Sequence, residues 1–507
     1  MYESRLTSIP AYWDNSVHKL PRAIAFIWEG RSFSYGEVDD LIARFAAFLV
    51  DKCGFQQWDR LAIALPNCLE FVVAYWAGLR LGGIVAPINT KLRADELEFV
   101  VQNIAPKAIV THDETWGAVG QFVGDTEVLH VGSSRPDGAS PFAEATSYAG
   151  TKATVPTINP PDVAVILHTS GTTGQPKGAI MTHETLFFNV RNAILAHSFR
   201  HEDVHLLTIP VFAPTCSYSL LASSAYLGSA ICIAPRPSVN ELIPLLRAHG
   251  CTTFIGVPTL FHLATNEPGF DAEGLPGLRL IAYSGSPMPA RTIKRLRESF
   301  PHVALHNFFG LTETIAITHV LPSKDAATRP ESIGKALPEI YTKIIDDAGD
   351  ELGPGEIGEL CLRRENIIPG YWNRPGLLDE AIQDGWFRTG DYALVDEEGY
   401  FYVQGRKKEM IIVAGQNVYA LEVEGVILKH DGVREAAVIG IPATGVRAAL
   451  GEMVKAVIVP QADVTLKELD IKRHCAQLLP SYKVPQVVEF RTELPKNATG
   501  KVMKREL

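Results

Sequence analysis

Cysteine is scarce in this sequence, and the few cysteines form no pattern of a metal or disulfide site. Only seven occur among the 507 residues, with no CxxC pair and no His/Cys cluster of zinc spacing. Structural zinc and a framework of disulfides are therefore not expected. A reducing compartment fits this cysteine usage best, so the sequence predicts a cytoplasmic protein.

Clusters of positive charge and a secretory signal are also missing. Lys and Arg number 47 against 57 Asp and Glu, which gives a formal net charge of −10, and no block of basic residues stands out. This balance argues against nucleic acid or an anionic membrane as the main partner. Residues 1–13 contain no apolar segment of the kind that a signal peptide requires.

One long stretch, residues 206–235, has no charged residue, but it is a poor candidate for a membrane span. Pro210 and Pro214 interrupt it early, and five serines and Gly228 dilute its apolar character. A spanning helix needs about 20 predominantly apolar residues. We therefore expect no membrane span, and we predict that this stretch forms the buried centre of a domain.

The composition is that of a globular protein, with 46% hydrophobic and 21% charged residues. The length suits roughly three or four folding units. Apolar runs at 163–167, 278–283 and 304–309 are typical of buried strands, and the spacing of apolar residues predicts a helix over 289–300. Strand, helix, strand indicates parallel pairing, so the predicted fold class is α/β, with ligands beyond the carboxyl ends of the strands.

The second half of the sequence changes character. Residues 332–403 contain short apolar pairs separated by turn signals, which is typical of a small β-barrel or a sandwich-like subdomain. After the charged run at 406–409, a mixture of strands and helices returns, as expected for an α+β domain of about 100 residues. The predicted divisions are an N-terminal domain, 1–407, which includes the β-rich subdomain, 332–404, and a C-terminal domain, 408–507.

The most informative segment is 169–178, which reads Thr-Ser-Gly-Thr-Thr-Gly-Gln-Pro-Lys-Gly after the first predicted strand. Its glycines allow a close approach of the backbone to a ligand, and its hydroxyls, backbone N–H groups and Lys177 can donate to phosphate oxygens. It is not a Walker A loop, which would need glycine at Pro176, and no GxGxxG opens a helix. The alternative, a flexible linker, is disfavoured by the buried strand on one side and a second apolar run on the other.

Five motifs, in this order along the chain, resemble those of the acyl-adenylate-forming superfamily. This superfamily contains acyl-CoA synthetases, adenylation domains of nonribosomal peptide synthetases and beetle luciferases, and the resemblance covers essentially the whole chain. The motifs are the loop at 169–178, Asn307-Phe308-Phe309-Gly310-Leu311-Thr312-Glu313, Trp386-Phe387-Arg388-Thr389-Gly390-Asp391, Gly405-Arg406-Lys407-Lys408-Glu409 and Pro495-Lys496-Asn497-Ala498-Thr499-Gly500-Lys501.

The resemblance implies an AMP-forming acid:CoA ligase that uses ATP, Mg²⁺ and coenzyme A. Coupling a carboxylate to AMP with loss of pyrophosphate makes a mixed anhydride that a thiol can attack, and cations must offset the repulsion between carboxylate and phosphate. The fold that it implies has a large N-terminal domain of doubly wound sheets with a small β-barrel subdomain, and a smaller, mobile C-terminal α+β domain.

Roles for individual residues also come from the resemblance. Thr312 would reach the α-phosphate, Glu313 would hold Mg²⁺, and Lys501 would bridge the substrate carboxylate and the α-phosphate during adenylation. The ATP-binding set that the resemblance implies is Thr169, Ser170, Gly171, Thr172, Thr173, Gly174, Lys177, Gly285, Ser286, Pro287, Asn307, Phe308, Phe309, Gly310, Asp391 and Arg406.

Within this set, Asp391 would accept hydrogen bonds from the ribose with help from Arg406. Phe309 and the segment 285–287 would form the two walls of an adenine slot, and many members of the superfamily have Tyr in place of Phe309. Without the resemblance, Glu313 would be a helix-start carboxylate, Asp391 a turn residue and Lys501 an exposed terminal lysine.

Two further positions concern the C-terminal domain. The resemblance implies that this domain rotates about Lys408, which withdraws Lys501 and presents the loop at Gly415 to form a tunnel for coenzyme A. The superfamily usually has glycine at Ala414, so the methyl group of Ala414 could narrow this tunnel.

The acyl pocket is expected around Phe212, Ala213 and Ser217. Many acyl-CoA synthetases have His where this chain has Ala213, so a bulky gate is missing. No Asp that could pair with an α-amino group occurs between residues 210 and 218, which disfavours an amino acid substrate. An apolar pocket with a few hydroxyls predicts an aryl, alicyclic or medium-chain fatty acid.

Several alternatives remain at this point. The acyl group could pass to a separate carrier protein instead of free CoA, or the enzyme could be specialised for one half-reaction, given Ala213 and Ala414. From another class, a nucleotide-binding pseudoenzyme would predict damage at Lys501, Glu313 or the loop, and all are intact. The partners expected are a small carboxylic acid and CoA, with a homodimer left open.

Overall fold

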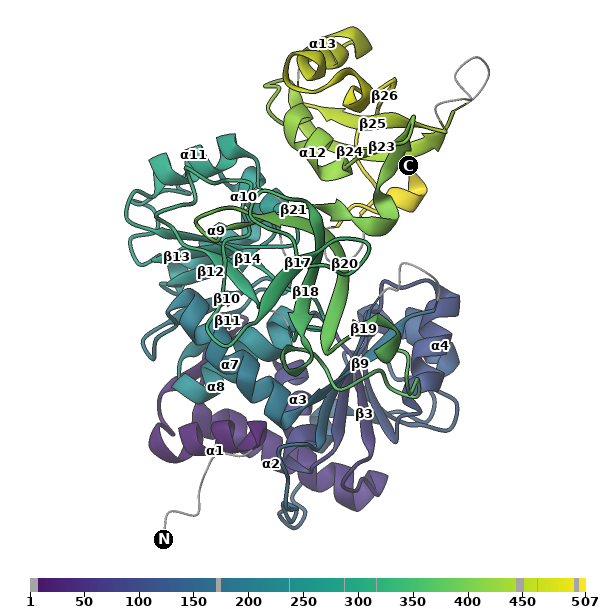
Figure 1. Ribbon diagram of the computed structural model, residues 1–507. Coiled ribbons are helices and arrows are strands. Elements are labelled where there is room, and N and C mark those ends of the chain that lie inside the picture. Colours follow the sequence, from purple (N-terminus) through teal and green to yellow (C-terminus); the bar gives the residue numbers. More distant parts are fainter. Residues whose placement is uncertain are drawn as a thin grey trace.

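Apolar runs of strand length form two large sheets, and these sheets position the candidate site. The structure is a computed structural model and describes residues 8–169, 175–236, 238–286, 288–315, 317–443, 451–462, 464–496 and 501–507. Figure 1 shows the two sheets with their helices in purple to green, and a smaller C-terminal part in yellow-green beside them.

The first sheet has seven strands and is covered by helices on both faces. Its strands are β3 (Arg60–Ala64), β4 (Ile84–Pro87), β5 (Ala108–His112), β6 (Glu127–Val131), β7 (Ser140–Pro141), β8 (Val163–Thr169) and β9 (Lys177–Thr182). They are ordered β7-β6-β5-β3-β4-β8-β9, and only β8 and β9 pair antiparallel. In β3, Leu61 and Ile63 belong to one hydrophobic cluster and Ala62 and Ala64 to another, so both faces are buried.

The second sheet has nine strands, and its centre is parallel. Its strands are β1 (Ile24–Trp28), β2 (Arg31–Ser34), β10 (Val204–Leu207), β11 (Ala230–Ile233), β12 (Thr253–Gly256), β13 (Leu280–Tyr283), β14 (Ala304–Phe309), β15 (His319–Leu321) and β16 (Lys335–Ala336). The order is β16-β15-β14-β13-β12-β10-β11-β1-β2. The strands predicted at 278–283 and 304–309 are confirmed as the parallel neighbours β13 and β14.

Helices on both faces of these sheets confirm the doubly wound α/β class. They are α1 (Ile9–Lys19), α2 (Tyr35–Cys53), α3 (Leu69–Arg80), α4 (Ala94–Ile104), α5 (Asp113–Val119), α6 (Phe142–Thr146), α7 (His183–His197), η2 (Thr215–Ala222), α8 (Ser223–Leu227), α9 (Val239–Ala248), α10 (Pro258–Ala264) and α11 (Ala290–Ser299), with a short turn η1 (Gly120–Phe122). The helix predicted over 289–300 is α11, whose Ile293 and Leu296 are buried.

A β-rich part follows, as expected. It contains β17 (Thr342–Ile345), β18 (Gly358–Arg363), β19 (Ile382–Gln383), β20 (Trp386–Val395) and β21 (Phe401–Arg406), with the short turns η3 (Arg364–Asn366) and η4 (Asp379–Ala381). All pairings are antiparallel, in the order β17-β18-β20-β19 with β21 also on β20. Among these fully described strands the pairings form an open sheet and do not close the expected barrel, because β19 and β21 share one edge of the long strand β20.

The C-terminal part is a mixed α+β unit. Its elements are η5 (Lys407–Glu409), β22 (Ile411–Val413), β23 (Gln416–Val418), α12 (Ala420–Ile427), β24 (Val433–Pro442), β25 (Glu452–Pro460), α13 (Glu468–Leu478), η7 (Ser481–Lys483), β26 (Val487–Phe490) and η8 (Lys504–Glu506). The sheet is ordered β24-β25-β26, and α12 and α13 cover it through Val423, Ile427 and Ile471. Lys429 contacts the N-terminal part, with its Nζ 3.0 Å from Glu331 Oε1.

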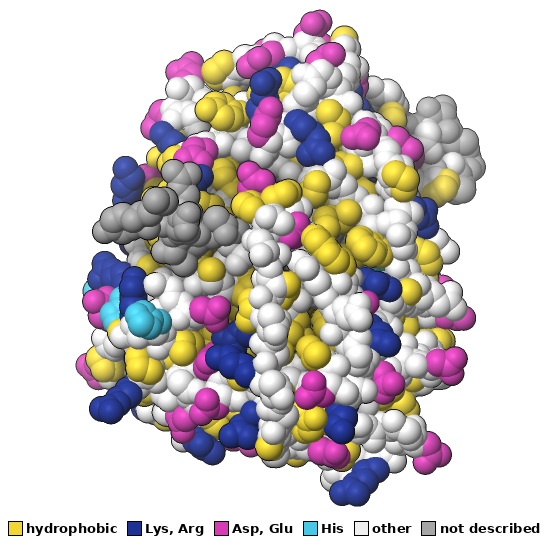
Figure 2. Space-filling model, turned by 90° about the horizontal axis from the view of Figure 1, so that it is seen from below, with side chains coloured by type: hydrophobic (Ala, Val, Ile, Leu, Met, Phe, Trp, Pro, Cys, Tyr) yellow, Lys and Arg dark blue, Asp and Glu magenta, His cyan; other side chains and the backbone are white. Residues whose placement is uncertain are grey.

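The surface mixes both signs of charge. Figure 2 shows Lys and Arg interspersed with Asp and Glu on the face seen from below, with hydrophobic side chains between them. No helix in the described ranges is both long enough and apolar enough to cross a bilayer. The uncharged stretch at 206–235 forms β10, η2, α8 and β11, as the prediction of a buried centre requires.

The turn between β22 and β23 gives a first prediction. Ala414 and Gly415 have φ values of +50° and +78°, in the left-handed region. An L-residue pays about 1 kcal/mol there and glycine does not. Glycine would remove this strain, but it also raises the entropy of the unfolded chain, which offsets part of the gain. We therefore expect Ala414→Gly to raise the free energy of unfolding by about 0.5 kcal/mol.

Urea denaturation measures this change, and Gly415→Ala provides the matched comparison. That substitution should lower the free energy of unfolding by about 1 kcal/mol, because it adds a second strained residue to the same turn. A loss of stability in Ala414→Gly would contradict the observed turn conformation.

Candidate active site

The carboxyl ends of β10, β13 and β14 lie at one edge of the nine-stranded sheet, because these strands are parallel. Tyr283 in β13 pairs with Asn307 in β14, so the segments that follow, 284–286 and 310–313, leave the sheet side by side. Gly285 has a φ of +93°, which glycine tolerates without strain. A Cβ atom placed on Gly285 would lie 3.8 Å from Lys501 Cε, so the C-terminal lysine reaches this edge.

Four charged groups face one another there. Asp391 in β20 pairs with Arg406 in β21, with Arg406 Nε 2.7 Å from Asp391 Oδ1. Burial raises the pKa of Asp391 to about 6, while Arg406 and Lys501 oppose this shift. Burial and Arg406 lower the pKa of Lys501, whereas Asp391 and Glu313 raise it. The structure therefore brings together four residues from distant motifs of the sequence.

Asp391 keeps one acceptor unused. Its side chain is 5% exposed, and its Oδ2 atom is buried without a hydrogen-bond partner among the residues that the structure describes. Buried polar atoms normally have a partner, so this oxygen is suited to a donor that a ligand would bring. A ribose hydroxyl is a donor of this kind, and the orphaned oxygen fits the nucleotide that the sequence implies.

Glu313 is held by a residue that the sequence analysis did not identify. The Tyr371 hydroxyl donates to Glu313 Oε1 at 2.7 Å, and the Lys177 ammonium lies 5.2 Å from the centroid of the Tyr371 ring. Burial and the neighbouring Glu313 raise the pKa of the Tyr371 phenol, so the hydroxyl keeps its proton. Tyr371 thus connects the carboxylate of one predicted motif to the cation of another.

The backbone around Tyr371 fastens these two motifs together. Trp372 N donates to Gly178 O at 2.7 Å and Ile180 N donates to Gly370 O at 3.1 Å, so this segment runs beside β9. Ile368 N donates to Glu313 O at 2.8 Å. The segment at 368–372 therefore fixes the distance between β9 and the turn that carries Glu313. The only sequence signal was the turn-rich character of the residues just after it.

The turn that carries Thr312 and Glu313 contains a strained residue. Ile315 has a φ of +59°, which is an outlier for a β-branched side chain. The Asn189 side chain donates to the Ile315 carbonyl and stabilises this conformation. Such strain costs of order 1–3 kcal/mol and concentrates at functional sites. Thr312 and Glu313 are both half-buried, which leaves them reachable by a ligand.

Some residues of the predicted set have other contacts. The Asn307 amide donates to Ser332 O at 2.8 Å, and the Phe308 ring packs against His197 in the core. Their side chains therefore support β14 from within. Phe309 is half-buried, and Gly310, Thr169 and Lys177 are also half-buried, while Ser286 is exposed.

The remaining predicted residues divide into three groups. Phe212 and Ala213 follow β10 at the same sheet edge, and Ala213 is buried. Lys408 and Gly415 are exposed, and a Cβ atom placed on Gly415 would meet no atom of the described residues within 4 Å. Outside the described residues lie Ser170, Gly171, Thr172, Thr173, Gly174 and Pro287, and the side chain of Ser217.

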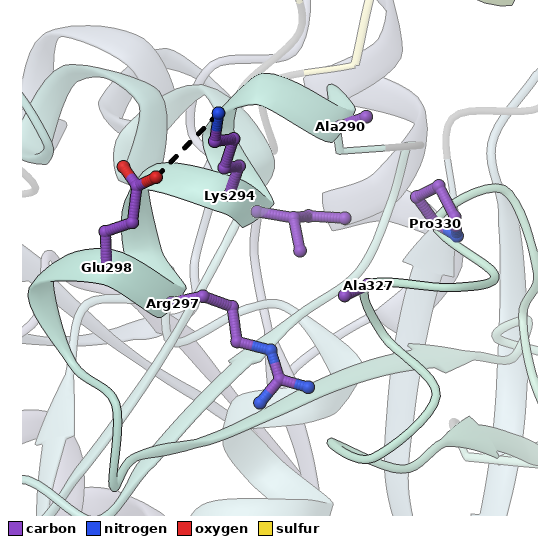
Figure 3. Close-up of a pocket in the computed structure, with 7 residues that line it drawn as sticks. Ala290, Lys294, Arg297, Glu298, Ala327 and Pro330 are labelled. Carbon is purple, nitrogen blue, oxygen red and sulfur yellow. Dashed lines mark ion pairs between the residues drawn. The ribbon is translucent and has the colours of Figure 1, made fainter.

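A pocket of about 400 Å³ is separate from this cluster. Figure 3 shows it between α11, which contributes Lys294 and Arg297, and the loop with Ala327 and Pro330. Lys294 Nζ lies 3.9 Å from Glu298 Oε1 on its rim. None of the residues lining this pocket belongs to the predicted set, so the candidate site is defined by the charged cluster.

Of the two carboxylates in the cluster, Asp391 pairs with Arg406, which leaves Glu313 for a cation. The described ranges contain no group of three or more His, Cys, Asp or Glu side chains arranged to hold a metal ion. Glu313 alone would suit a hard cation that takes its other ligands from phosphate oxygens and water.

Comparisons with known proteins identify the family. The profile of the AMP-binding enzyme family matches residues 13–372, and that of the AMP-binding enzyme C-terminal domain matches residues 422–501. A long-chain-fatty-acid–CoA ligase of Escherichia coli O157:H7 is 32% identical over 538 aligned residues, covering 99% of this chain and 94% of the relative.

Solved structures agree with this result. ATP-bound MatB from Rhodopseudomonas palustris has a TM-score of 0.86 and 28% identity, covering 98% of each chain. The o-succinylbenzoate CoA synthetase MenE from Bacillus subtilis, solved with its acyl-adenylate intermediate, has a TM-score of 0.87 and 26% identity, covering 98% of this chain and 97% of that one. This chain therefore belongs to the AMP-binding enzyme family, within the superfamily of AMP-forming acyl-CoA synthetases.

Proposed function

We propose that the protein is an AMP-forming acid:CoA ligase that activates a largely apolar carboxylic acid with ATP and transfers the acyl group to coenzyme A. The observation that carries this proposal is the approach of Lys501 to Gly285, Asp391, Arg406 and Glu313 at the sheet edge. Its relatives act as CoA ligases on acids as different as long-chain fatty acids and o-succinylbenzoate, so the family alone does not select the acid.

The charges of the site suit the formation of an acyl-adenylate. A carboxylate and an α-phosphate repel each other, and an ammonium between them stabilises the charge that moves to pyrophosphate. Lys501 would supply this ammonium, Thr312 would donate to the α-phosphate and Lys177 would meet the outer phosphates. Asp391 Oδ2, which lacks a partner, would accept from the ribose.

Mg²⁺ belongs to the same proposal. Glu313 would hold it, and Tyr371 keeps the Glu313 carboxylate in one orientation by donating to Oε1. The ion would neutralise phosphate charge when it is bound. The adenine would lie between Phe309 and the segment at 285–287, of which Gly285 and Ser286 are exposed.

The second half-reaction needs a different arrangement. The closeness of Lys501 to Gly285 and the exposure of Gly415 support an arrangement suited to adenylation. Rotation of the C-terminal domain, 408–507, about Lys408 would exchange these two elements and open a path for CoA. Phe212, Ala213 and Ser217 would contact the acyl group. A cytoplasmic location and the oligomeric state stay predictions.

Exchange of labelled pyrophosphate into ATP tests the first half-reaction. We expect exchange with one or more of an aryl, an alicyclic and a medium-chain fatty acid, and none with an α-amino acid. Addition of CoA should then produce the thioester together with AMP. Loading of a separate carrier protein without any reaction of free CoA would favour the alternative acceptor, and the absence of exchange with every acid would refute the proposal.

Loss of the Tyr371 hydroxyl should weaken metal binding. In Tyr371→Phe the ring stays beneath Lys177 while Glu313 loses its donor. Removing a partner of a metal-binding carboxylate typically costs 10–100-fold in metal affinity, so we expect about a 10-fold loss. Mn²⁺ titration followed by electron paramagnetic resonance, with ATP bound, measures the affinity directly.

The matched control is Tyr392→Phe. Tyr392 donates to Asp347 Oδ1 at 3.0 Å and is also buried, but its partner lies in the turn after β17 instead of the candidate site. Its loss should leave the Mn²⁺ affinity unchanged. Equal effects of both substitutions would contradict the role given to Tyr371.

A further inference from the structure

The last residues of the chain are anchored to the C-terminal sheet. Met503 N donates to Pro495 O at 2.8 Å, and Val502 forms a bridge with Lys496. Val502 and Leu507 pack against a small apolar cluster that contains Val457 and Leu494. Terminal residues usually fray unless they are tied down, so these contacts make the tail part of the domain.

Lys504 makes the strongest polar contact of this tail. Its Nζ lies 2.9 Å from Glu424 Oε1 in α12 and 3.1 Å from Glu409 Oε2 in η5. The Lys504 side chain is 18% exposed and that of Glu424 is 11% exposed. Burial raises the pKa of Glu424 and Lys504 opposes this shift, so each charge stabilises the other. The Lys504–Glu424 pair is therefore largely shielded from water, whereas Glu409 is 39% exposed, and removing one partner of a buried pair alone would leave an uncompensated charge.

Glu409 lies next to the proposed hinge, which is bounded by ion pairs on both sides. On one side, Lys407 Nζ lies 2.7 Å from Asp347 Oδ1 and 3.6 Å from Glu359 Oε2, both in the β-rich part. On the other side, Glu409 is paired with Lys504. Lys408 stands between them, exposed and with no ion pair inside the described ranges. Backbone rotation is therefore least hindered at this one residue.

We infer that Lys504 is a positioning residue for Lys501, an inference that rests on the proposed function. Lys504 joins the tail to α12 and to the residue that follows the hinge, three positions after the lysine that enters the site. When the domain turns about Lys408, the tail then moves with it as one rigid body. Lys501 arrives at the sheet edge in a fixed geometry because its backbone has no freedom relative to α12.

The alternative is that Lys504 only neutralises the buried Glu424. Replacing both residues separates the two ideas, because Lys504→Met with Glu424→Gln removes the Lys504–Glu424 salt bridge without leaving a buried charge. Glu424→Gln alone keeps a polar acceptor for Lys504 and serves as its comparison. Lys294→Met is the matched lysine control, since Lys294 forms an exposed ion pair on α11, far along the chain from the tail.

Amide hydrogen exchange of the full chain, without any substrate, measures how firmly residues 501–507 are held to the C-terminal sheet. In the double variant we expect faster amide exchange in 501–507 and unchanged protection in β24 and β25. Both single controls should keep the tail protected. A double variant whose tail stays as protected as the wild type would overturn the inference, as would general loss of protection in the sheet.

Kinetics of the same variants add the functional readout. A displacement of about 1 Å can cost about 100-fold in rate, so we expect pyrophosphate exchange in the double variant to fall on this scale. Thioester formation from a supplied acyl-adenylate should change less than about twofold, since Lys501 is withdrawn in that step. An equal fall in both half-reactions would contradict the inference. An inactive wild type would instead refute the proposed function. Amide hydrogen exchange in 501–507 would still show whether Lys504 holds the tail in place.

Discussion

Lys501→Ala is expected to lower carboxylate-dependent exchange of pyrophosphate into ATP by about 100- to 1,000-fold, the usual cost of removing one preorganised charge-stabilising group. Lys501 is exposed as a residue, but its ammonium interacts with Asp391, Arg406 and Glu313, and its loss would remove this cation from the bond being formed. Burial and Arg406 lower the pKa of Lys501, and an ammonium interacts more strongly with phosphate where less water surrounds it.

The same variant should still form a thioester from a supplied acyl-adenylate and CoA at close to the wild-type rate. Lys496→Ala is the matched control, because Lys496 lies in the same terminal loop but pairs with Glu435 on the C-terminal sheet. It should change exchange by less than about twofold, as expected for a partly exposed ion pair. Equal loss of both half-reactions in Lys501→Ala would show that the lysine does not serve adenylation specifically.

Acid is expected to destabilise the N-terminal part steeply below pH 6.5. His183, His197, His205 and His319 are at most 2% exposed. Burial lowers the pKa of His183 and His205 to about 4 and that of His319 to about 3, and it also lowers the pKa of His197. An unfolded histidine titrates near pH 6.5, so the unfolded chain binds more protons in this window. Stability is therefore full above about pH 6.5 and falls toward pH 4.

Each of these histidines contributes a slope of about 1.4 kcal/mol per pH unit, so four together give about 5 kcal/mol per pH unit. Folded domains are stable by only about 5–15 kcal/mol, and the native state should be lost near pH 5. Asp391 acts in the opposite direction, because its pKa is raised to about 6 and the folded chain holds the extra proton. One such group offsets only part of the loss.

Urea denaturation at pH 7.5, 6.0 and 5.5 measures this slope. His319→Phe is the informative variant, since His319 packs edge-on against Phe401 and its Nε2 atom is buried with no partner in the described part of the chain. A phenyl ring fits the same place and does not titrate. The slope should become shallower by about 1.4 kcal/mol per pH unit. A free energy of unfolding that stays constant between pH 7.5 and 5.5 would refute the account.

Much of the fold could be predicted from the sequence because its signals are local. The apolar runs at 163–167, 278–283 and 304–309 became β8, β13 and β14, and the amphipathic segment became α11. The resemblance implied more than one sheet, but the assignment of strands to sheets was not predicted, and β8 belongs to a different sheet from β13 and β14. Strand periodicity shows that a strand is buried but contains no information on which strand lies beside it.

The candidate site, like the fold, could be predicted only where its signals are local in the sequence. Short motifs marked Glu313, Asp391 and Lys501, and the structure places their charges close together. Tyr371 was missed because its importance comes from contacts 58 residues away along the chain, with Glu313. Lys504 was missed for a similar reason, since its partners lie in η5 and α12. Pairings of this kind depend on the tertiary fold and leave no pattern in the neighbouring residues.

The transfer of isotope from a carboxylic acid labelled with ¹⁸O in both carboxylate oxygens tests the central claim most directly. If the carboxylate attacks the α-phosphate and the thiol of CoA then attacks the acyl carbon, one labelled oxygen must leave with AMP. Mass spectrometry of the products should therefore show one ¹⁸O in AMP and none in pyrophosphate. Label in inorganic phosphate, or AMP without label, would contradict an acyl-adenylate formed at this site.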